Sequence, residues 1–115
     1  MILFRPVSSA ELKLIEQNEY KVFPPRLPEQ PIFYPVLNRE YASEIAKKWN
    51  VKSSTDRKGF VLQFEVDDEY CSKFEIQTVG SSRHQELWIP AEELENFNQH
   101  IVGKIKVIAV YSENG

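Results

Sequence analysis

Glu86 is the residue with the clearest potential for chemistry. It lies in the sequence HQELWIP, whose spacing predicts a β-strand over residues 84–89. If Leu87 and Ile89 face the core, Glu86 and Trp88 share the opposite face, where a carboxylate beside a large aromatic ring can occupy a pocket that shifts its pKa. A strand carboxylate in contact with water has the same pattern, so the sequence leaves both interpretations open.

Two arginines and a tyrosine are further candidates for binding. Arg5 precedes Pro6 at the end of an expected first strand, where it can hold a phosphate or carboxylate with two hydrogen bonds or pair with an acidic side chain. Arg26 and Tyr34 belong to the proline-rich sequence FPPRLPEQPIFYP (23–35), which cannot form a regular helix. This stiff segment either forms the wall of a ligand cleft or covers the edge of the core.

The sequence contains no signature of a common catalytic or metal site. Its four glycines are not clustered, so no phosphate-binding glycine loop is expected. Cys71 is the single cysteine and excludes an internal disulfide. His84 and His100 lie far apart without a second cysteine, and the acidic run 67–69 lacks the ligand spacing of a calcium loop. We therefore expect no metal site.

Composition narrows the class of protein further. The 115 residues carry a formal net charge of −3, and no basic stripe interrupts the sequence, which argues against a nonspecific nucleic-acid binder. The opening MILFRPVSS has too short an apolar run for a signal peptide, and no segment reaches the length of a membrane span. These features predict a cytoplasmic protein without nucleic-acid or membrane partners.

Two main helices are expected. Ser8 and Glu11 form a capping-box pattern that predicts a helix fading near Asn18 or Tyr20. Asn38 is a good N-cap for a helix over 38–49. In that second helix the large side chains recur at every fourth position and predict a stripe that packs in the core, formed by Tyr41, Ile45 and Trp49.

The remainder of the chain is rich in strand patterns. Alternating apolar residues predict four strands, over residues 60–66, 74–79, 84–89 and 104–111. A helical turn is expected between the first two of these strands, over 67–70, and a short helix that opens at Pro90 is expected before the last. Phe60, Phe64 and Phe74 are expected in the core. Sequential strands with tight turns predict one α+β domain (1–115) with a largely antiparallel, possibly split sheet, two main helices, a short third helix and a flexible tail at 112–115.

Four segments of the chain carry a resemblance to a known family: LFRPVSSAELKLI, FPPRLPEQPIFYPVLNREYASEIAKKWN, FEVDDEY and ELWIPAEELENFNQHIVGKIKV. They resemble small bacterial proteins that carry the label "ADP-ribosylation/crystallin J1", over nearly the whole chain. More remotely, the layout looks like a compact ADP-ribosyltransferase-type domain. Such enzymes bind NAD in a cleft of a split antiparallel sheet.

The resemblance implies a role for each candidate residue. Arg5 would hold the ribose or phosphate of NAD, Tyr34 would stack near the nicotinamide, and Glu86 would bind a ribose hydroxyl and stabilise the developing positive charge. The implied site has Glu86 as its catalytic residue, and its cofactor-binding residues are Arg5, Tyr34, Arg26, His84 and Trp88.

The chain departs from the transferase pattern at two places. His84 stands where many such enzymes have Glu or Gln two residues before the catalytic glutamate, and FYPV replaces the usual Ser-Thr-Ser motif. The alternative function is therefore a non-catalytic module that binds a small metabolite or a protein partner in the same cleft. Homodimerisation through a strand edge is a third reading, and the sequence leaves the oligomeric state and any catalytic activity open.

Overall fold

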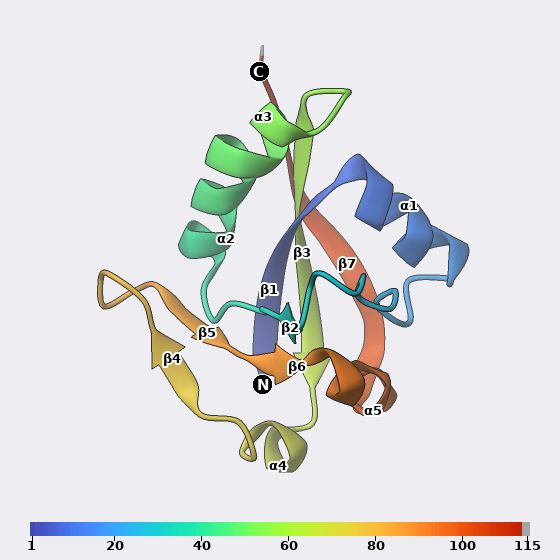
Figure 1. Cartoon of the computed structure of the whole chain (residues 1–115), viewed down its shortest axis with the longest axis vertical. Coiled ribbons are helices and arrows are strands. Elements are labelled where there is room, and N and C mark those ends of the chain that lie inside the picture. Colours follow the sequence, from blue (N-terminus) through green and yellow to red (C-terminus); the bar gives the residue numbers. More distant parts are fainter. Residues whose placement is uncertain (114–115) are drawn as a thin grey trace.

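Three long antiparallel strands form the centre of the fold (Figure 1). The computed structural model describes residues 1–113, and in it β3 (Lys58–Val66) lies between β1 (Ile2–Ser8) and β7 (Ile101–Ser112). In the ladder between β1 and β3, Leu3 lies opposite Phe64 and Arg5 opposite Leu62. The expected antiparallel α+β architecture is confirmed at this level.

A second set of short strands joins this sheet through the segment 35–37. Val36 exchanges backbone hydrogen bonds of 2.8 and 2.9 Å with Phe4 of β1. On the opposite edge of the segment, the backbone of Pro35 and Leu37 forms hydrogen bonds with β5 (Gln85–Leu87). Next to β5 lies β4 (Ile76–Thr78). The pair β2 (Ile32–Phe33) and β6 (Ile89–Pro90) continues the same two segments in the same register.

Pro6 lies inside β1 and does not end it, in contrast to the expectation from the sequence. Because the amide and carbonyl of Phe4 point toward Val36, those of Pro6 point to the same edge and away from β3. Proline has no N–H to donate at that edge. The ladder with β3 therefore continues to Ser8, while among the described residues no strand bonds the other edge beyond Phe4.

Helices lie near both ends of the three-stranded sheet (Figure 1). The first, α1 (Ser9–Gln17), ends at Asn18 as expected, but the side chain of Ser8 makes no capping hydrogen bond, and the carboxylate of Glu11 binds Arg5. The turn after β3 is α4 (Asp68–Cys71), which Asp67 caps. After Pro90 follow η2 (Ala91–Glu93) and α5 (Leu94–Gln99), the expected short helix.

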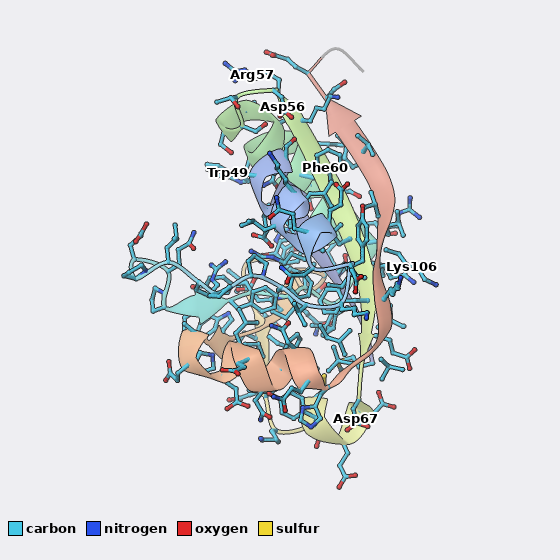
Figure 2. The ribbon with its side chains drawn as sticks, turned by 90° about the vertical axis from the view of Figure 1, so that its right-hand side faces the viewer. Trp49, Asp56, Arg57, Phe60, Asp67 and Lys106 are labelled. Carbon is cyan, nitrogen blue, oxygen red and sulfur yellow. The ribbon has the colours of Figure 1, made fainter. Side chains whose placement is uncertain are left out.

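The second main helix is longer and rotated relative to the prediction. It runs through α2 (Arg39–Ile45), a π-helical turn η1 (Ala46–Asn50) and α3 (Val51–Ser53). The buried side chains are Ala42, Ala46 and Val51, whereas Trp49 is 70% exposed and projects outward (Figure 2). The placement of Trp49 in the core was wrong because the wide turn changes the helical phase and because only small residues fit against the sheet at this crossing.

Gly59 is the residue that allows this close crossing. A Cβ atom built on Gly59 would lie 2.7 Å from the carbonyl oxygen of Ala46 and 3.0 Å from Cβ of Asn50. The start of β3 therefore touches the backbone of η1 directly.

Two hydrophobic clusters lie on the two faces of the sheet. The larger packs β1, β3, α1, α5 and the proline-rich segment around Phe23, Phe33, Phe64 and Phe97. The smaller packs the second helix on Val36 and Val61. Phe64 is a core residue as expected, and the other two expected phenylalanines, Phe60 and Phe74, are partly buried against the larger cluster.

The last strand departs from simple alternation. It is longer than expected, and its pairing with β3 shifts between Val61 and Leu62 and again between Gln63 and Glu65, where Gly103 has a φ of 76°. As a result Ile105 is buried whereas Val107 is 38% exposed. Lys106 points away from the body on this edge strand (Figure 2).

The end of the chain bears on one further expectation. Ser112 is the last residue of β7 and not part of a tail, and residues 114–115 of the expected flexible tail lie outside the described residues. Within residues 1–113 the structure has no helix of the length and apolar character that a membrane span requires.

The crossing at Gly59 yields a test of the fold. We expect Gly59→Ala to lower the free energy of unfolding by about 1–3 kcal/mol, because the added methyl group meets backbone that cannot easily move. Lys58→Ala, at an exposed neighbouring position, is the control. Urea denaturation checks both, and equal stabilities of the two variants would contradict the close crossing.

Candidate functional site

A cleft of about 440 Å³ opens at the edge of β1 that Pro6 leaves unpaired. Its walls come from β1, the segment after β2, the second helix and the β4–β5 hairpin. Four of the six residues expected at the site line it, namely Arg5, Tyr34, Glu86 and Trp88; the other lining residues are Pro6, Val36, Ile45, Asn50 and Val79. Most of these side chains are apolar or aromatic, which is typical of sites for small molecules.

Glu86 is the buried carboxylate of this cleft. Its side chain lies on β5 opposite Val36 and is only 8% exposed, so the reading of a strand carboxylate in contact with water is wrong. Oε2 accepts a hydrogen bond from the Tyr41 hydroxyl at 2.8 Å, and Oε1 accepts one from Nε1 of Trp88 at 2.7 Å. Since each carboxylate oxygen has two lone pairs, both oxygens can still accept a bond from a ligand.

Tyr41 holds Glu86 from the first turn of α2. Asn38 caps this helix, because its Oδ1 accepts a hydrogen bond of 2.7 Å from the backbone amide of Tyr41. This cap fixes the position of Tyr41 in the first turn. Burial, followed by the hydrogen bond to Glu86, raises the pKa of Tyr41 to about 12. The phenol therefore stays protonated and acts as a donor to the carboxylate.

His84 lies behind Tyr41 and not in the cleft, so the expectation that it contacts the cofactor is not met by this geometry. Its ring stacks on Tyr41 with centroids 4.4 Å apart, and Nε2 lies 3.1 Å from Oε2 of Glu44. The hydrogen bond with His84 is the main reason that the pKa of Glu44 falls below its ordinary value. His84 supports the residue that holds Glu86.

Tyr34 and Trp88 form the mouth of the cleft. They occupy opposite positions in the register shared by β2–β6 and the Val36–Glu86 bridge, and their rings meet edge to face with centroids 6.4 Å apart. The two side chains are 42% and 45% exposed. Large aromatic surfaces in this arrangement can stack against a planar ligand.

Arg5 is held at the wall by an internal partner. Nε and Nη2 of Arg5 donate to the two carboxylate oxygens of Glu11 at 2.6 and 2.8 Å, and the guanidinium lies 4.5 Å from the centre of the Phe33 ring. The side chain of Arg5 is 11% exposed and that of Glu11 is 22% exposed. The sequence left two interpretations of Arg5 open, and the structure shows the one in which Arg5 pairs with an acidic side chain.

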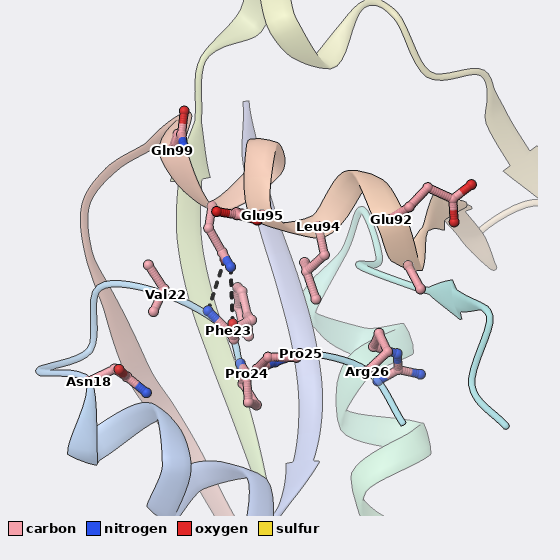
Figure 3. A pocket seen from close by; sticks show the side chains of 12 residues that line it. Asn18, Val22, Phe23, Pro24, Pro25, Arg26, Glu92, Leu94, Glu95 and Gln99 are labelled. Atoms are coloured by element: carbon pink, nitrogen blue, oxygen red, sulfur yellow. Dashed lines mark hydrogen bonds between the residues drawn. The ribbon is translucent and has the colours of Figure 1, made fainter. Parts of the chain in front are cut away.

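Arg26 lines a different cavity, a groove of about 540 Å³ between the proline-rich segment and α5 (Figure 3). Asn98 of α5 fixes the segment there, because its side-chain amide exchanges two hydrogen bonds with the backbone of Phe23, at 2.9 and 3.0 Å. Pro24, Pro25 and Leu94 provide apolar walls. Arg26 therefore does not share the cleft of Glu86, although the sequence placed both in one site.

Asn50 is a cleft residue that the sequence analysis missed. It lies at the end of the π-helical turn, and its Oδ1 atom is buried with no donor among the described residues. A buried acceptor of this kind favours a ligand that carries a hydrogen-bond donor. No motif in the sequence indicates it, because a single asparagine has no spacing pattern that marks it as a binding residue.

Comparisons of the chain with protein-family models, curated proteins and solved structures return no match. Within residues 1–113, no group of three or more His, Cys, Asp or Glu side chains is arranged to hold a metal ion. The chemical interpretation of the cleft therefore depends on its own geometry.

The partly buried Tyr41 makes the stability of the protein sensitive to alkaline pH. Because its pKa is higher in the fold than the ordinary value of 10.0, the stabilisation is fully present below pH 10 and is lost as the pH rises through about 12. We expect Tyr41→Phe to lose less unfolding free energy across this window than the wild type does.

Denaturation at several pH values measures this difference. Tyr111→Phe is the matched control, because it removes a phenol that donates to the neutral hydroxyl of Ser43. Identical pH slopes for wild type and Tyr41→Phe would show that the phenol is not held protonated by its surroundings.

Proposed function

We propose that the cleft binds NAD and that the chain is a small ADP-ribosyltransferase-like protein of the "ADP-ribosylation/crystallin J1" type. The observation that carries this proposal is Glu86, a buried carboxylate with free lone pairs at an aromatic-lined cleft. Arg5 and Tyr34 line the same cleft, which agrees with the cofactor-binding roles that the resemblance implies for them.

Glu86 would act on the bond between ribose and nicotinamide. That bond breaks with its electron pair leaving on the nicotinamide nitrogen, and positive charge develops on the ribose. A buried carboxylate stabilises such charge more strongly than one in water, because the surrounding dielectric is low. An acceptor nucleophile, or water, then attacks the ribose carbon and releases its proton.

The neighbours of Glu86 suit this role. Tyr41 and Trp88 each donate to one of its oxygens, so the carboxylate is oriented before a ligand arrives. The amide of Asn50 supplies a buried acceptor in the same cleft, which fits a ligand with an N–H or O–H group. Tyr34 and Trp88 would stack on the planar part of that ligand.

A non-catalytic binding module is the second candidate. The exposed pair of Tyr34 and Trp88 favours it, because two aromatic faces at a cleft mouth bind planar ligands without any chemistry. In that case Glu86 would orient Trp88 and have no further role.

Turnover of NAD by matched variants separates the two candidates. We expect Glu86→Gln to reduce the rate of nicotinamide release about 100-fold or more, because a neutral amide stabilises positive charge poorly. Glu93→Gln is the control: Glu93 accepts a hydrogen bond from Tyr70 at 2.6 Å, so this pair resembles the Glu86–Tyr41 pair but is not part of the cleft lining. Nicotinamide release is followed by chromatography.

Both variants must first unfold like the wild type in urea. If wild-type protein binds NAD without releasing nicotinamide, and Trp88→Ala weakens binding more than Glu86→Gln does, the binding module is correct. If the folded wild type does not bind NAD at millimolar concentration, the cofactor assignment is wrong.

A further inference from the structure

Two guanidinium groups approach the ring of Phe33. Arg5 lies 4.5 Å from the ring centre and Arg26 lies 5.8 Å from it. The two cations are close enough that Arg5 contributes to lowering the pKa of Arg26. Like charges in a partly buried place are unfavourable unless an anion compensates them.

Glu11 forms an ion pair with only one of these cations. Its two oxygens accept the two hydrogen bonds from Arg5, which occupies the face of Arg5 that could otherwise bind a phosphate. The charge of Glu11 also acts on Arg26 and raises its pKa, but less than burial and Arg5 lower it. Two arginines and one glutamate leave a net positive charge at this place, and Arg26 is the cation without an ion pair among the described residues.

The side chain of Arg26 makes a single hydrogen bond among the described residues, and its acceptor is neutral. Nη2 donates to the carbonyl of Ile32 at 3.0 Å, whereas Nε is buried and has no acceptor among residues 1–113. The ion pairs of the described residues do not include Arg26. Burial is the main cause that lowers its pKa. A buried guanidinium N–H without a partner is costly, and an anionic acceptor would remove that cost.

The position of Arg26 connects the two cavities. It lines the groove beside Pro25 and Leu94 (Figure 3), and it shares the ring of Phe33 with Arg5, which lines the cleft. An anion at Arg26 would therefore lie between the aromatic mouth of the cleft and the apolar groove. A ligand with planar groups on both sides of a phosphate could use both cavities.

We infer that Arg26, and not Arg5, is the residue that binds the phosphoryl group of the ligand, and that Arg5 is a structural clamp paired with Glu11. This inference rests on the proposed function and specifies its substrate class. The site would select nucleotides over the corresponding nucleosides. It also gives to Arg26 the phosphate contact that the family resemblance implies for Arg5.

Calorimetry with nicotinamide mononucleotide and nicotinamide riboside tests the inference, because these two ligands differ only by the phosphate. We expect wild-type protein to bind the mononucleotide at least about tenfold more tightly than the riboside, and Arg26→Gln to abolish this difference. Arg57→Gln is the control, since it removes the same charge from an exposed residue at the far end of the molecule (Figure 2). This control should keep the difference in full.

Inorganic pyrophosphate is the second probe, with binding followed at the backbone amides of the non-proline residues of 26–33 in unsubstituted protein. It needs no variant, so it still decides if Arg26→Gln fails to fold. We expect saturable shifts at these amides. Absence of shifts at millimolar pyrophosphate would overturn the inference.

The outcomes separate this inference from the proposed function. If NAD binds but Arg26→Gln leaves the advantage of the mononucleotide over the riboside intact, the phosphoryl site is wrong and the NAD cleft stands. If pyrophosphate shifts the amides of 26–33 while NAD and the riboside fail to reach the cleft residues, the NAD cleft is wrong and the phosphoryl site stands.

Discussion

The backbone pairing of the segment 35–37 is the interaction on which the rest of the structure depends. Val36 bonds to Phe4 on one side, while Pro35 and Leu37 bond to β5 on the other, so this short segment joins the three-stranded sheet to the strand that carries Glu86. Pro6 prevents the joint from extending along β1. The edge of β1 is therefore paired at Phe4 and unpaired beside it, and the cleft lies at the unpaired part.

Two charged side chains, Glu86 and Arg26, occupy positions that the fold alone does not require to be charged. Glu86 is buried without a cation among its hydrogen-bond partners, since Tyr41 and Trp88 are neutral donors. Arg26 is partly buried without an anion. Both arrangements cost free energy that a purely structural site would avoid by pairing the charges. A ligand that bears developing positive charge near Glu86 and negative charge near Arg26 would offset both.

Much of the fold was predictable from local patterns, and part of the site was too. The antiparallel α+β class, the strand of residues 60–66 and the helix after Asn38 follow from alternation and capping, which act within a few residues. Trp49 was misplaced because a π-helical turn and the contact at Gly59 depend on a crossing far along the chain. His84 and Arg26 were assigned to a cleft that they do not line, because the stacking of His84 on Tyr41 and the packing of Arg26 beside α5 depend on residues distant in the sequence. The pairing of Arg5 with Glu11 replaced a capping box that spacing alone favours.

An amide NMR titration of the isotope-labelled protein with NAD tests the central claim most directly. The structure predicts saturable shifts at the residues that surround the opening beside Val36, with the largest at Tyr34, Asn50 and Glu86, and a loss of those shifts when Tyr34 and Trp88 are both replaced by alanine. Shifts confined to the outer face of β7, or no shifts in a well-folded protein at millimolar NAD, would contradict the assignment of this cleft as the ligand site.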